Sequence, residues 1–358
     1  MSLDTDKIRR QADAGHAESQ FLLSQLSLQN GDLDAMAHWL REASANGIAD
    51  AQAALGHCHE RGLGMIRDYA AALEMYDVAV ASQSPVAAYR KAELLYKSSL
   101  VTGHLDSIRS LLQVAAAAGF EPALRTVAYL NAQCGRRSTE LGEDVPLIPE
   151  IRDLDRQQVN DEPGIAVFSR VLDAQDCAYL INLSRPYLTS SDVIDPNSER
   201  DGMRSTVRTS SGTYLPFQLV DFIARYIELK IVQATGESLE NSEPMSILCY
   251  APGQYYQPHF DYFDPKLPVS AGLLEDGGQR TASAVTYLAV PDAGGGTSFP
   301  NLDLTVPPQP GATLWFRNCH ANGSIDPRSL HAGDPVERGS KWVVTKWYRE
   351  GRTRYLEL

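Results

Sequence analysis

Two histidines and an aspartate carry the clearest chemical signal in this sequence. One residue separates His259 from Asp261, and His331 follows much later in the chain. If the chain around His259 is a strand, His259 and Asp261 point to the same side and can reach one metal ion, while His331 approaches from a neighbouring strand. Two imidazoles and one carboxylate leave three positions open on an octahedral ion, which is typical of non-haem Fe(II) oxygenases.

Lys341 indicates what fills part of those open positions. Residues 338–340 are typical of a turn, and residues 341–347 of the strand that follows it. A lysine in an apolar strand is costly unless an anion pairs with it, and a small bound dicarboxylate would supply that anion. The alternative is that Lys341 extends along the strand start to the surface. With the three metal ligands, Lys341 predicts an oxygen-dependent hydroxylation of an unactivated carbon.

The elements that must position these residues are short strands. From about residue 161 the chain alternates short apolar runs with Gly and Pro turns, which is typical of a sandwich or jelly roll. We expect strands near residues 166–172, 246–251, 255–263, 281–290, 297–299, 312–317 and 340–349. Asp173 and Asp176 predict a capped helix start, and an amphipathic helix over residues 219–230 should stop at Gly236.

The first part of the chain differs in its sequence pattern and contains internal repeats. An Ala-x-x-x-Gly-x-x-x-Ala frame at residues 43–51 recurs at 79–87, with Gln83 in the glycine position, and at 115–123. Gly15, Gly47, Gln83 and Gly119 are therefore 32, 36 and 36 residues apart, a period typical of helix-turn-helix arrays. Residues 51–72 resemble the Sel-like variety of tetratricopeptide repeat.

We therefore predict an α+β protein of two domains. A helical repeat domain covers residues 1–138, a linker rich in acids and prolines covers 139–160, and a double-stranded β-helix with flanking helices covers 161–358. His57, Cys58 and His59 fall within a helix of the first domain. We interpret them as structural rather than metal-binding, because neighbouring helical positions point to different sides.

Composition limits the class of protein. Hydrophobic residues are 43% and charged residues 22%, which is ordinary for a globular protein, and the formal net charge of −13 argues against a nucleic-acid partner. The five cysteines are odd in number and scattered, so we expect a reducing compartment. The absence of an apolar signal sequence or membrane-spanning run predicts a cytoplasmic protein with no membrane association.

The order of motifs from residue 161 to residue 350 resembles the prolyl 4-hydroxylase branch of the 2-oxoglutarate/Fe(II) dioxygenases. The matching segments are Val207–Gly212, Tyr250–Asp261, Arg280–Leu288, Gly294–Pro300, Gly311–Phe316, Ser329–Val336 and Gly339–Trp347. The resemblance implies a distorted double-stranded β-helix and a reaction that uses Fe(II), 2-oxoglutarate and O2, with ascorbate as the expected reductant.

The resemblance also implies a role for each matching residue. His259, Asp261 and His331 would ligate iron and so be the catalytic residues. Lys341 and Tyr250 would bind the distal carboxylate of 2-oxoglutarate, with Thr297 in the same pocket or in a plain turn. The family uses the positions of Arg208 and Tyr256 at the substrate mouth, and places a closing loop where this chain has residues 192–206.

One position departs from the family pattern, since Asp334 stands where a cysteine is common. The resemblance favours C4 hydroxylation of a prolyl residue in a peptide or protein, with the repeats holding the polypeptide or a protein partner. The alternative is a free amino or cyclic imino acid such as proline or pipecolate, with the repeats serving self-association. A more remote alternative is an inactive repeat scaffold, against which the complete ligand set argues.

Overall fold

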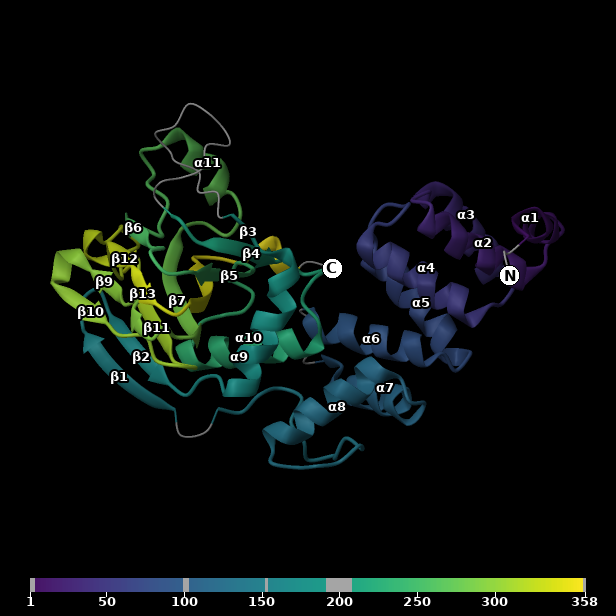
Figure 1. Ribbon diagram of the computed structural model, residues 1–358, viewed down its shortest axis with the longest axis horizontal. Helices are drawn as coiled ribbons and strands as arrows, with labels where there is room; N and C mark the ends of the chain where they lie inside the picture. The colour runs from purple at the N-terminus through teal and green to yellow at the C-terminus, as the bar shows by residue number, and fades with distance from the viewer. Residues whose placement is uncertain (1–3, 99–102, 152–153, 191–207, 357–358) are drawn as a thin grey trace. The chain divides into compact units, whose positions relative to one another are not determined.

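The structure is a computed structural model that describes residues 4–98, 103–151, 154–190 and 208–356 (Figure 1). It divides into two compact units, which are described separately below. Unit 1 contains residues 1–147 and 221–223, and unit 2 contains residues 148–220 and 224–356. The division falls inside the segment that we expect to be a linker. Residues 155–160 of that segment form a strand of unit 2 rather than a linker.

Unit 1 is a helical array, as the repeat pattern predicts. Its described helices are α1 (Thr5–Asp13), α2 (Ala17–Gln29), α3 (Leu33–Ala45), α4 (Ala49–Arg61), α5 (Tyr69–Ala81), α6 (Pro85–Lys97), α7 (Leu105–Ala117) and α8 (Glu121–Gln133). Side chains of Asp32, Asp68 and Ser84 accept hydrogen bonds from the first turns of α3, α5 and α6. These caps satisfy amide groups that the start of a helix leaves without partners.

The repeated frame marks the same turn three times. Gly47, Gln83 and Gly119 have φ angles of 84°, 62° and 78°. Each turn places the helix before it against the helix after it, and the flanking alanines of all three frames (Ala43, Ala51, Ala79, Ala87, Ala115 and Ala123) are fully buried. Gln83 adopts the left-handed backbone conformation, which glycine adopts with little strain. The packing of the flanking Ala79 and Ala87 therefore outweighs the backbone strain at Gln83.

Unit 2 contains two facing antiparallel sheets, as a jelly roll does. Among the described residues, the larger sheet has the order β1-β2-β11-β7-β14-β5-β4-β3 and the smaller one β10-β9-β12-β6. The strands of the larger sheet are β1 (Asp155–Asn160), β2 (Ile165–Ser169), β3 (Thr189–Ser190), β4 (Ser211–Leu215), β5 (Met245–Tyr250), β7 (Arg280–Ala289), β11 (Thr313–Arg317) and β14 (Lys341–Arg349). Those of the smaller sheet are β6 (Tyr256–His259), β9 (Thr297–Phe299), β10 (Leu304–Val306) and β12 (His331–Gly333).

Short elements complete unit 2. Strands β8 (Ala293–Gly294) and β13 (Val336–Arg338) pair with each other, and helix α11 (Pro268–Leu274) interrupts the connection from β6 to β7. Helix α9 (Ala174–Ser184) begins with the predicted capping box of Asp173 and Asp176. Helix α10 (Phe222–Thr235) ends before Gly236, as predicted. The prediction of a double-stranded β-helix with flanking helices is confirmed.

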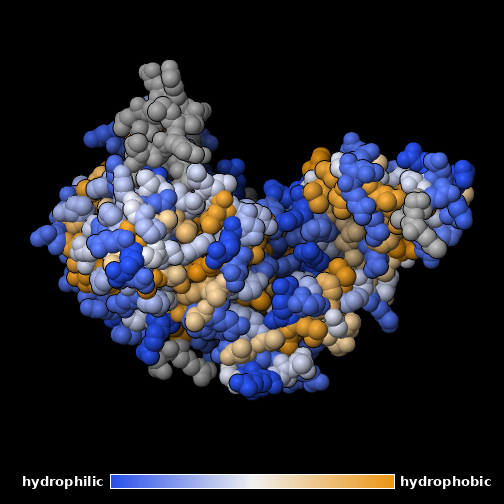
Figure 2. Space-filling model, viewed as in Figure 1, coloured by the Kyte–Doolittle hydropathy of each residue, from blue (hydrophilic) through white to orange (hydrophobic). Residues whose placement is uncertain are grey.

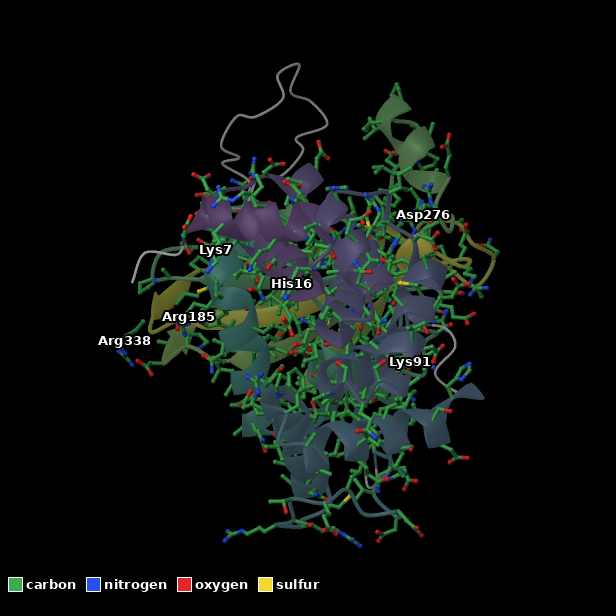
Figure 3. All side chains as sticks on the ribbon, turned by 90° about the vertical axis from the view of Figure 1, so that its right-hand side faces the viewer. Lys7, His16, Lys91, Arg185, Asp276 and Arg338 are labelled. Carbon is green, nitrogen blue, oxygen red and sulfur yellow. The ribbon has the colours of Figure 1, made fainter. Side chains whose placement is uncertain are left out.

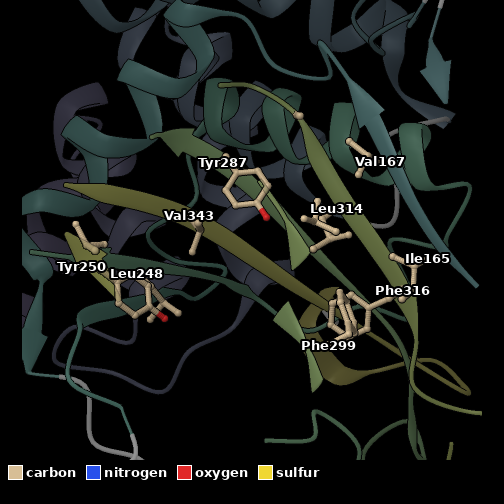
Figure 4. Close-up of a cluster of buried hydrophobic side chains, with 12 residues drawn as sticks. Ile165, Val167, Leu248, Tyr250, Tyr287, Phe299, Leu314, Phe316 and Val343 are labelled. Atoms are coloured by element: carbon tan, nitrogen blue, oxygen red, sulfur yellow. The ribbon is translucent and has the colours of Figure 1, made fainter. Parts of the chain in front are cut away.

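The space between the two sheets holds a hydrophobic core of unit 2 (Figure 4). Phe299 of the smaller sheet meets Phe316 of the larger sheet edge to face, with ring centroids 5.2 Å apart. Leu248, Val343 and Tyr287 extend this core along the larger sheet. This core therefore fixes the distance between the two sheets close to the predicted metal ligands, which the smaller sheet carries.

The surface of both units is mostly hydrophilic on the face drawn in Figure 2, with scattered hydrophobic patches. This agrees with the negative net charge and ordinary composition. Among the described residues, no helix combines the length and the hydrophobicity needed to span a membrane.

Candidate active site

Strands β6 and β12 place the two histidines side by side. His259 at the end of β6 and His331 at the start of β12 are direct partners in the antiparallel pairing, and their ring centroids are 4.2 Å apart. Asp261 lies beyond the end of β6, in a bend. The prediction that one strand projects both His259 and Asp261 is therefore wrong in detail, because the strand stops at His259.

The three side chains nevertheless converge. Asp261 Oδ1 lies 3.7 Å from His259 Nε2, and Asp261 Oδ2 lies 3.6 Å from His331 Nε2. Among the described residues, this trio is the only group of three or more His, Cys, Asp or Glu side chains arranged to hold a metal ion. His57, Cys58 and His59 form no such group with any described side chain, and Cys58 is buried in the hydrophobic core of its helix pair.

Backbone carbonyls orient both imidazoles. His259 Nδ1 lies 2.8 Å from the carbonyl oxygen of Gln257, and His331 Nδ1 lies 2.9 Å from that of Ser329. Since a carbonyl oxygen can only accept, each Nδ1 carries the hydrogen, and each Nε2 is directed to the centre of the trio. This is the tautomer that a metal ion needs.

Electrostatics favour the ligand forms of His259 and Asp261. Burial, reinforced by the neighbouring His331, lowers the pKa of His259 to about 3, so that its ring is neutral. Burial by itself raises the pKa of Asp261, but the two imidazoles, Arg280 and a hydrogen bond from Ser283 outweigh it, and the pKa is lowered. A neutral imidazole and an ionised carboxylate are the protonation states that bind a divalent cation.

Arg280 supports the bend that carries Asp261. Its Nη1 donates to the carbonyl oxygen of Asp261 at 3.3 Å. Its Nε and Nη2 donate to the two carboxylate oxygens of Glu243 at 2.6 and 2.7 Å. The guanidinium also lies over the ring of Trp347, 4.0 Å from its centroid. This buried anchor compensates for the missing strand geometry after His259.

A cavity extends from the trio into unit 2, between the sheets. Its walls include Leu248, Val285 and Val343, and it is also lined by all the other residues that the sequence assigns to a site: Arg208, Tyr250, Tyr256, Thr297 and Lys341. The structure therefore gathers every sequence-predicted site residue in one place. The predicted closing loop, residues 192–206, lies outside the described residues.

Lys341 is buried rather than directed to the surface. Arg338 projects outward from the molecule (Figure 3), whereas Lys341, three residues later, is only 3% exposed. Lys341, Val343, Thr345 and Trp347 all face the cavity, as the strand alternation predicts. Burial lowers the pKa of Lys341 to about 8, and Asp334 offsets part of this effect.

Lys341 has little to neutralise its charge. Its Nζ donates to the carbonyl oxygen of Gly296 at 3.2 Å and lies 5.6 Å from the ring centroids of Tyr250 and Tyr287. No carboxylate of the described residues forms an ion pair with it. A buried ammonium group without a carboxylate partner is an unfavourable arrangement that a bound anion would relieve.

Tyr250 and Thr297 lie beside this lysine. Tyr250 is the direct strand partner of Lys341, and burial raises its pKa to about 12, so that its hydroxyl keeps its proton. Thr297 is buried, and its Oγ1 lies 2.9 Å from the hydroxyl oxygen of Tyr287. Tyr287 is a neighbour of Lys341 and Thr297 that the sequence reasoning missed, although its place in the apolar run of residues 281–290 could have suggested it.

Arg208 and Tyr256 line the cavity beside His259. The ring of Tyr256 stacks on His259 with a centroid separation of 3.5 Å, and the Arg208 guanidinium lies 5.3 Å from the Tyr256 centroid. Arg208 and Leu248 also line a second cavity of about 250 Å³, together with residues of β3 and β4. Arg208 therefore stands between the metal-ligand trio and a second hollow in the surface of unit 2.

Asp334, the departure from the family pattern, makes a defined contact. It accepts a hydrogen bond from Ser298 Oγ at 2.6 Å, which connects the end of β12 to β9. It also contributes to the charge around Lys341, since it counters the lowering of the lysine pKa. Asp334 therefore acts on Lys341 in the cavity as well as on the link between β12 and β9.

Parts of this chain are similar to known proteins. The profile of the 2OG-Fe(II) oxygenase superfamily matches residues 245–349. A probable prolyl 4-hydroxylase 3 of Arabidopsis thaliana is 36% identical over 209 residues, which cover 53% of this chain and 70% of that protein. The 2OG complex of a viral collagen prolyl hydroxylase from Paramecium Bursaria Chlorella virus-1 is similar at 26% identity, covering 51% of this chain and 94% of that chain, with a TM-score of 0.38.

The helical unit has a separate likeness. A Sel1 repeat protein from Oxalobacter formigenes is 28% identical, and the match covers 34% of this chain and 96% of that chain with a TM-score of 0.30. The relationship of the catalytic part rests on the profile match and on the plant relative. On that evidence the chain belongs to the prolyl 4-hydroxylase family of 2-oxoglutarate- and Fe(II)-dependent dioxygenases.

Proposed function

We propose that this enzyme hydroxylates a prolyl residue of a peptide or protein at C4. The observation that carries the proposal is a single cavity with the His259, Asp261 and His331 trio at one place and the buried Lys341 ammonium at another. The first feature suits a metal with open positions and the second suits a dicarboxylate. The names of the plant relatives support proline as the target.

His259, Asp261 and His331 are the proposed iron ligands. Their Nε2 atoms and carboxylate oxygens approach one another within 4.8 Å, and the donor set of two imidazoles and one carboxylate fits Fe(II) with three positions left for other ligands. When bound, the iron and 2-oxoglutarate supply the oxygen activation that amino-acid side chains cannot provide.

Lys341 and Tyr250 are the proposed partners of the distal carboxylate of 2-oxoglutarate. The lysine supplies a buried positive charge and the tyrosine a protonated hydroxyl, and both donate to an anion. Thr297 and Tyr287 add hydroxyl groups nearby, and the walls formed by Leu248, Val285 and Val343 exclude water. Water exclusion strengthens these charge interactions and protects the reaction from side products.

Arg208 and Tyr256 are the proposed contacts to substrate, because Tyr256 stacks on His259, Arg208 lies over Tyr256, and Arg208 borders both cavities. The second cavity favours a polypeptide, since a free amino acid has no flanking residues to place there. The helical repeats of unit 1 also favour a polypeptide or protein partner. A free amino or cyclic imino acid remains the alternative, in which case the repeats would serve stability or self-association.

The cellular compartment of the protein is a separate proposal, which rests on its cysteines. All five cysteines are free thiols, which suits a reducing compartment, with the cytoplasm as the expected one. Ascorbate as the reductant stays a prediction.

The test is a comparison of two substrate panels under oxygen with Fe(II), 2-oxoglutarate and ascorbate. One panel contains proline peptides with varied flanking residues, and the other contains free proline, pipecolate and common amino acids. We expect succinate formation together with a gain of one oxygen on proline peptides, and neither with the His331→Ala variant. Hydroxylation of free amino or imino acids alone would refute the polypeptide proposal.

A further inference from the structure

A buried chain of hydrogen bonds leads to the Asp261 carboxylate. Asn318 Nδ2 donates to Ser283 Oγ at 2.9 Å, and Ser283 Oγ donates to Asp261 Oδ2 at 2.6 Å. Ser283 and Asn318 are both fully buried. The Asp261 carboxylate sets the direction of these hydrogen bonds. An ionised carboxylate can only accept, and a serine hydroxyl has one hydrogen to donate, so Ser283 must accept from Asn318.

The strand pairing holds Ser283 at this place. Ser283 lies on β7, opposite Phe316 of β11 on one side and Trp347 of β14 on the other. It has the same alternation as Val285, which lines the cavity, so its hydroxyl faces the inside. A side chain in the middle of three paired strands has little freedom to move away from Asp261.

Asn318 is fixed just as firmly. It follows the last residue of β11, and its backbone N–H donates to the carbonyl oxygen of Thr281 at 2.8 Å. Its own carbonyl oxygen accepts from the backbone N–H of Asp326 at 2.9 Å. Both backbone groups of Asn318 are therefore used, and its side-chain amide is held against Ser283.

We propose that Ser283, oriented by Asn318, is a positioning residue that makes Asp261 a one-oxygen metal ligand. Ser283 engages Oδ2, so that Oδ1 is left to the ion. A carboxylate that instead chelated through both oxygens would occupy a further coordination position, one that the cosubstrate or O2 needs. This inference rests on the metal-ligand roles proposed above for His259, Asp261 and His331.

Removal of the hydroxyl should affect the carboxylate without displacing the chain around it. The backbone of Asp261 is held separately by Arg280, whose Nη1 donates to the Asp261 carbonyl oxygen. In Ser283→Ala the carboxylate therefore keeps its position but gains freedom to rotate. Loss of a partner that orients a metal ligand typically weakens metal binding or activity by about 10- to 100-fold.

The experiment uses the full chain loaded with Co(II) without oxygen, because the visible absorption of Co(II) reports the number and geometry of its ligands. The variants are Ser283→Ala, Ser283→Thr, which restores a hydroxyl, and Asn318→Ala, which leaves the Ser283 hydroxyl free to turn. The matched control is Thr286→Val, because Thr286 is a buried hydroxyl residue of the same strand that bonds to Thr313 at 2.8 Å. The measured quantities are the Co(II) spectrum and the dissociation constant of 2-oxoglutarate.

We expect Ser283→Ala to change the Co(II) spectrum and to weaken 2-oxoglutarate binding by about 10- to 100-fold, with a smaller effect in Asn318→Ala. Ser283→Thr and Thr286→Val should resemble the unmodified protein. A Ser283→Ala protein that matches Thr286→Val in both measurements would overturn the inference. His259→Ala distinguishes a failure of this inference from a failure of the proposed metal site. If that variant binds Co(II) normally, the proposed metal site itself is wrong.

Discussion

Lys341→Met should stabilise the protein without cosubstrate and at the same time weaken cosubstrate binding. The aliphatic part of Lys341 packs in the cavity wall, and methionine replaces it with similar volume. The ammonium group, however, is buried without a carboxylate partner among the described residues. The two effects therefore have opposite signs, which a purely structural role of Lys341 would not produce.

The size of the stabilising effect follows from the lysine pKa. Burial lowers this pKa from 10.5 to about 8, which corresponds to about 3 kcal/mol at about 1.36 kcal/mol per pKa unit. Because the folded-state pKa is lowered, this cost is fully present below pH 8 and disappears as the pH rises past 10.5. Lys341→Met also loses the hydrogen bond to Gly296, so the net gain at pH 7 should be on the order of 1–2 kcal/mol.

The loss in binding should be larger. Truncation of one partner in a buried, hydrogen-bonded charge pair costs about 2–5 kcal/mol, which is a factor of about 30 or more in the dissociation constant of 2-oxoglutarate. Unfolding in urea, followed by tryptophan fluorescence, gives the stability. Three of the four tryptophans (Trp315, Trp342 and Trp347) lie in unit 2, so this signal mainly reports the catalytic unit. Anaerobic titration of the Co(II)-loaded protein gives the affinity.

Lys346→Met is the matched control. Lys346 lies on the same strand but on its other face, fully buried, and its Nζ pairs with Glu228 at 2.5 Å. Its removal leaves a buried carboxylate without this partner, so we expect a loss of about 3–5 kcal/mol in stability and unchanged cosubstrate affinity in the folded protein. If Lys341→Met instead loses stability and binds 2-oxoglutarate as tightly as the unmodified protein, the assignment of Lys341 is refuted.

Three further changes test other parts of the molecule. His331→Ala should abolish Co(II) binding when the metal-free protein is titrated with Co(II) without oxygen, and retained binding would contradict the metal-ligand assignment. Tyr250→Phe should raise the dissociation constant of 2-oxoglutarate by about 10- to 150-fold, since a hydrogen bond to a charged group contributes about 1.5–3 kcal/mol; an unchanged constant would exclude this role. Lys97→Met should destabilise unit 1 by about 3–5 kcal/mol in thermal unfolding, because Lys97 pairs with the buried Glu60 at 2.9 Å, while succinate formation by the folded enzyme stays unchanged.

Much of the fold could be predicted because its signals are local. The helix turns follow from one small residue in a fixed frame, and even Gln83 adopts the left-handed conformation of its glycine counterparts. The alternation along β14 places Lys341 and Trp347 on the same cavity wall. The exact end of β6 could not be predicted, because Arg280 and Glu243, which support the bend at Asp261, lie far away in the sequence.

The same reason explains why sequence reasoning finds the candidate metal ligands but not the residues that orient them. A His-x-Asp pair with a distant His is recognisable because few side chains bind iron. Ser283 and Asn318 are common residue types separated by 35 positions, and they meet Asp261 only because β7 and β11 pair in one register. A shift of that register by one residue would turn the Ser283 hydroxyl to the opposite face of the sheet. The orientation of the Asp261 carboxylate therefore depends on how β7 and β11 pair in the larger sheet.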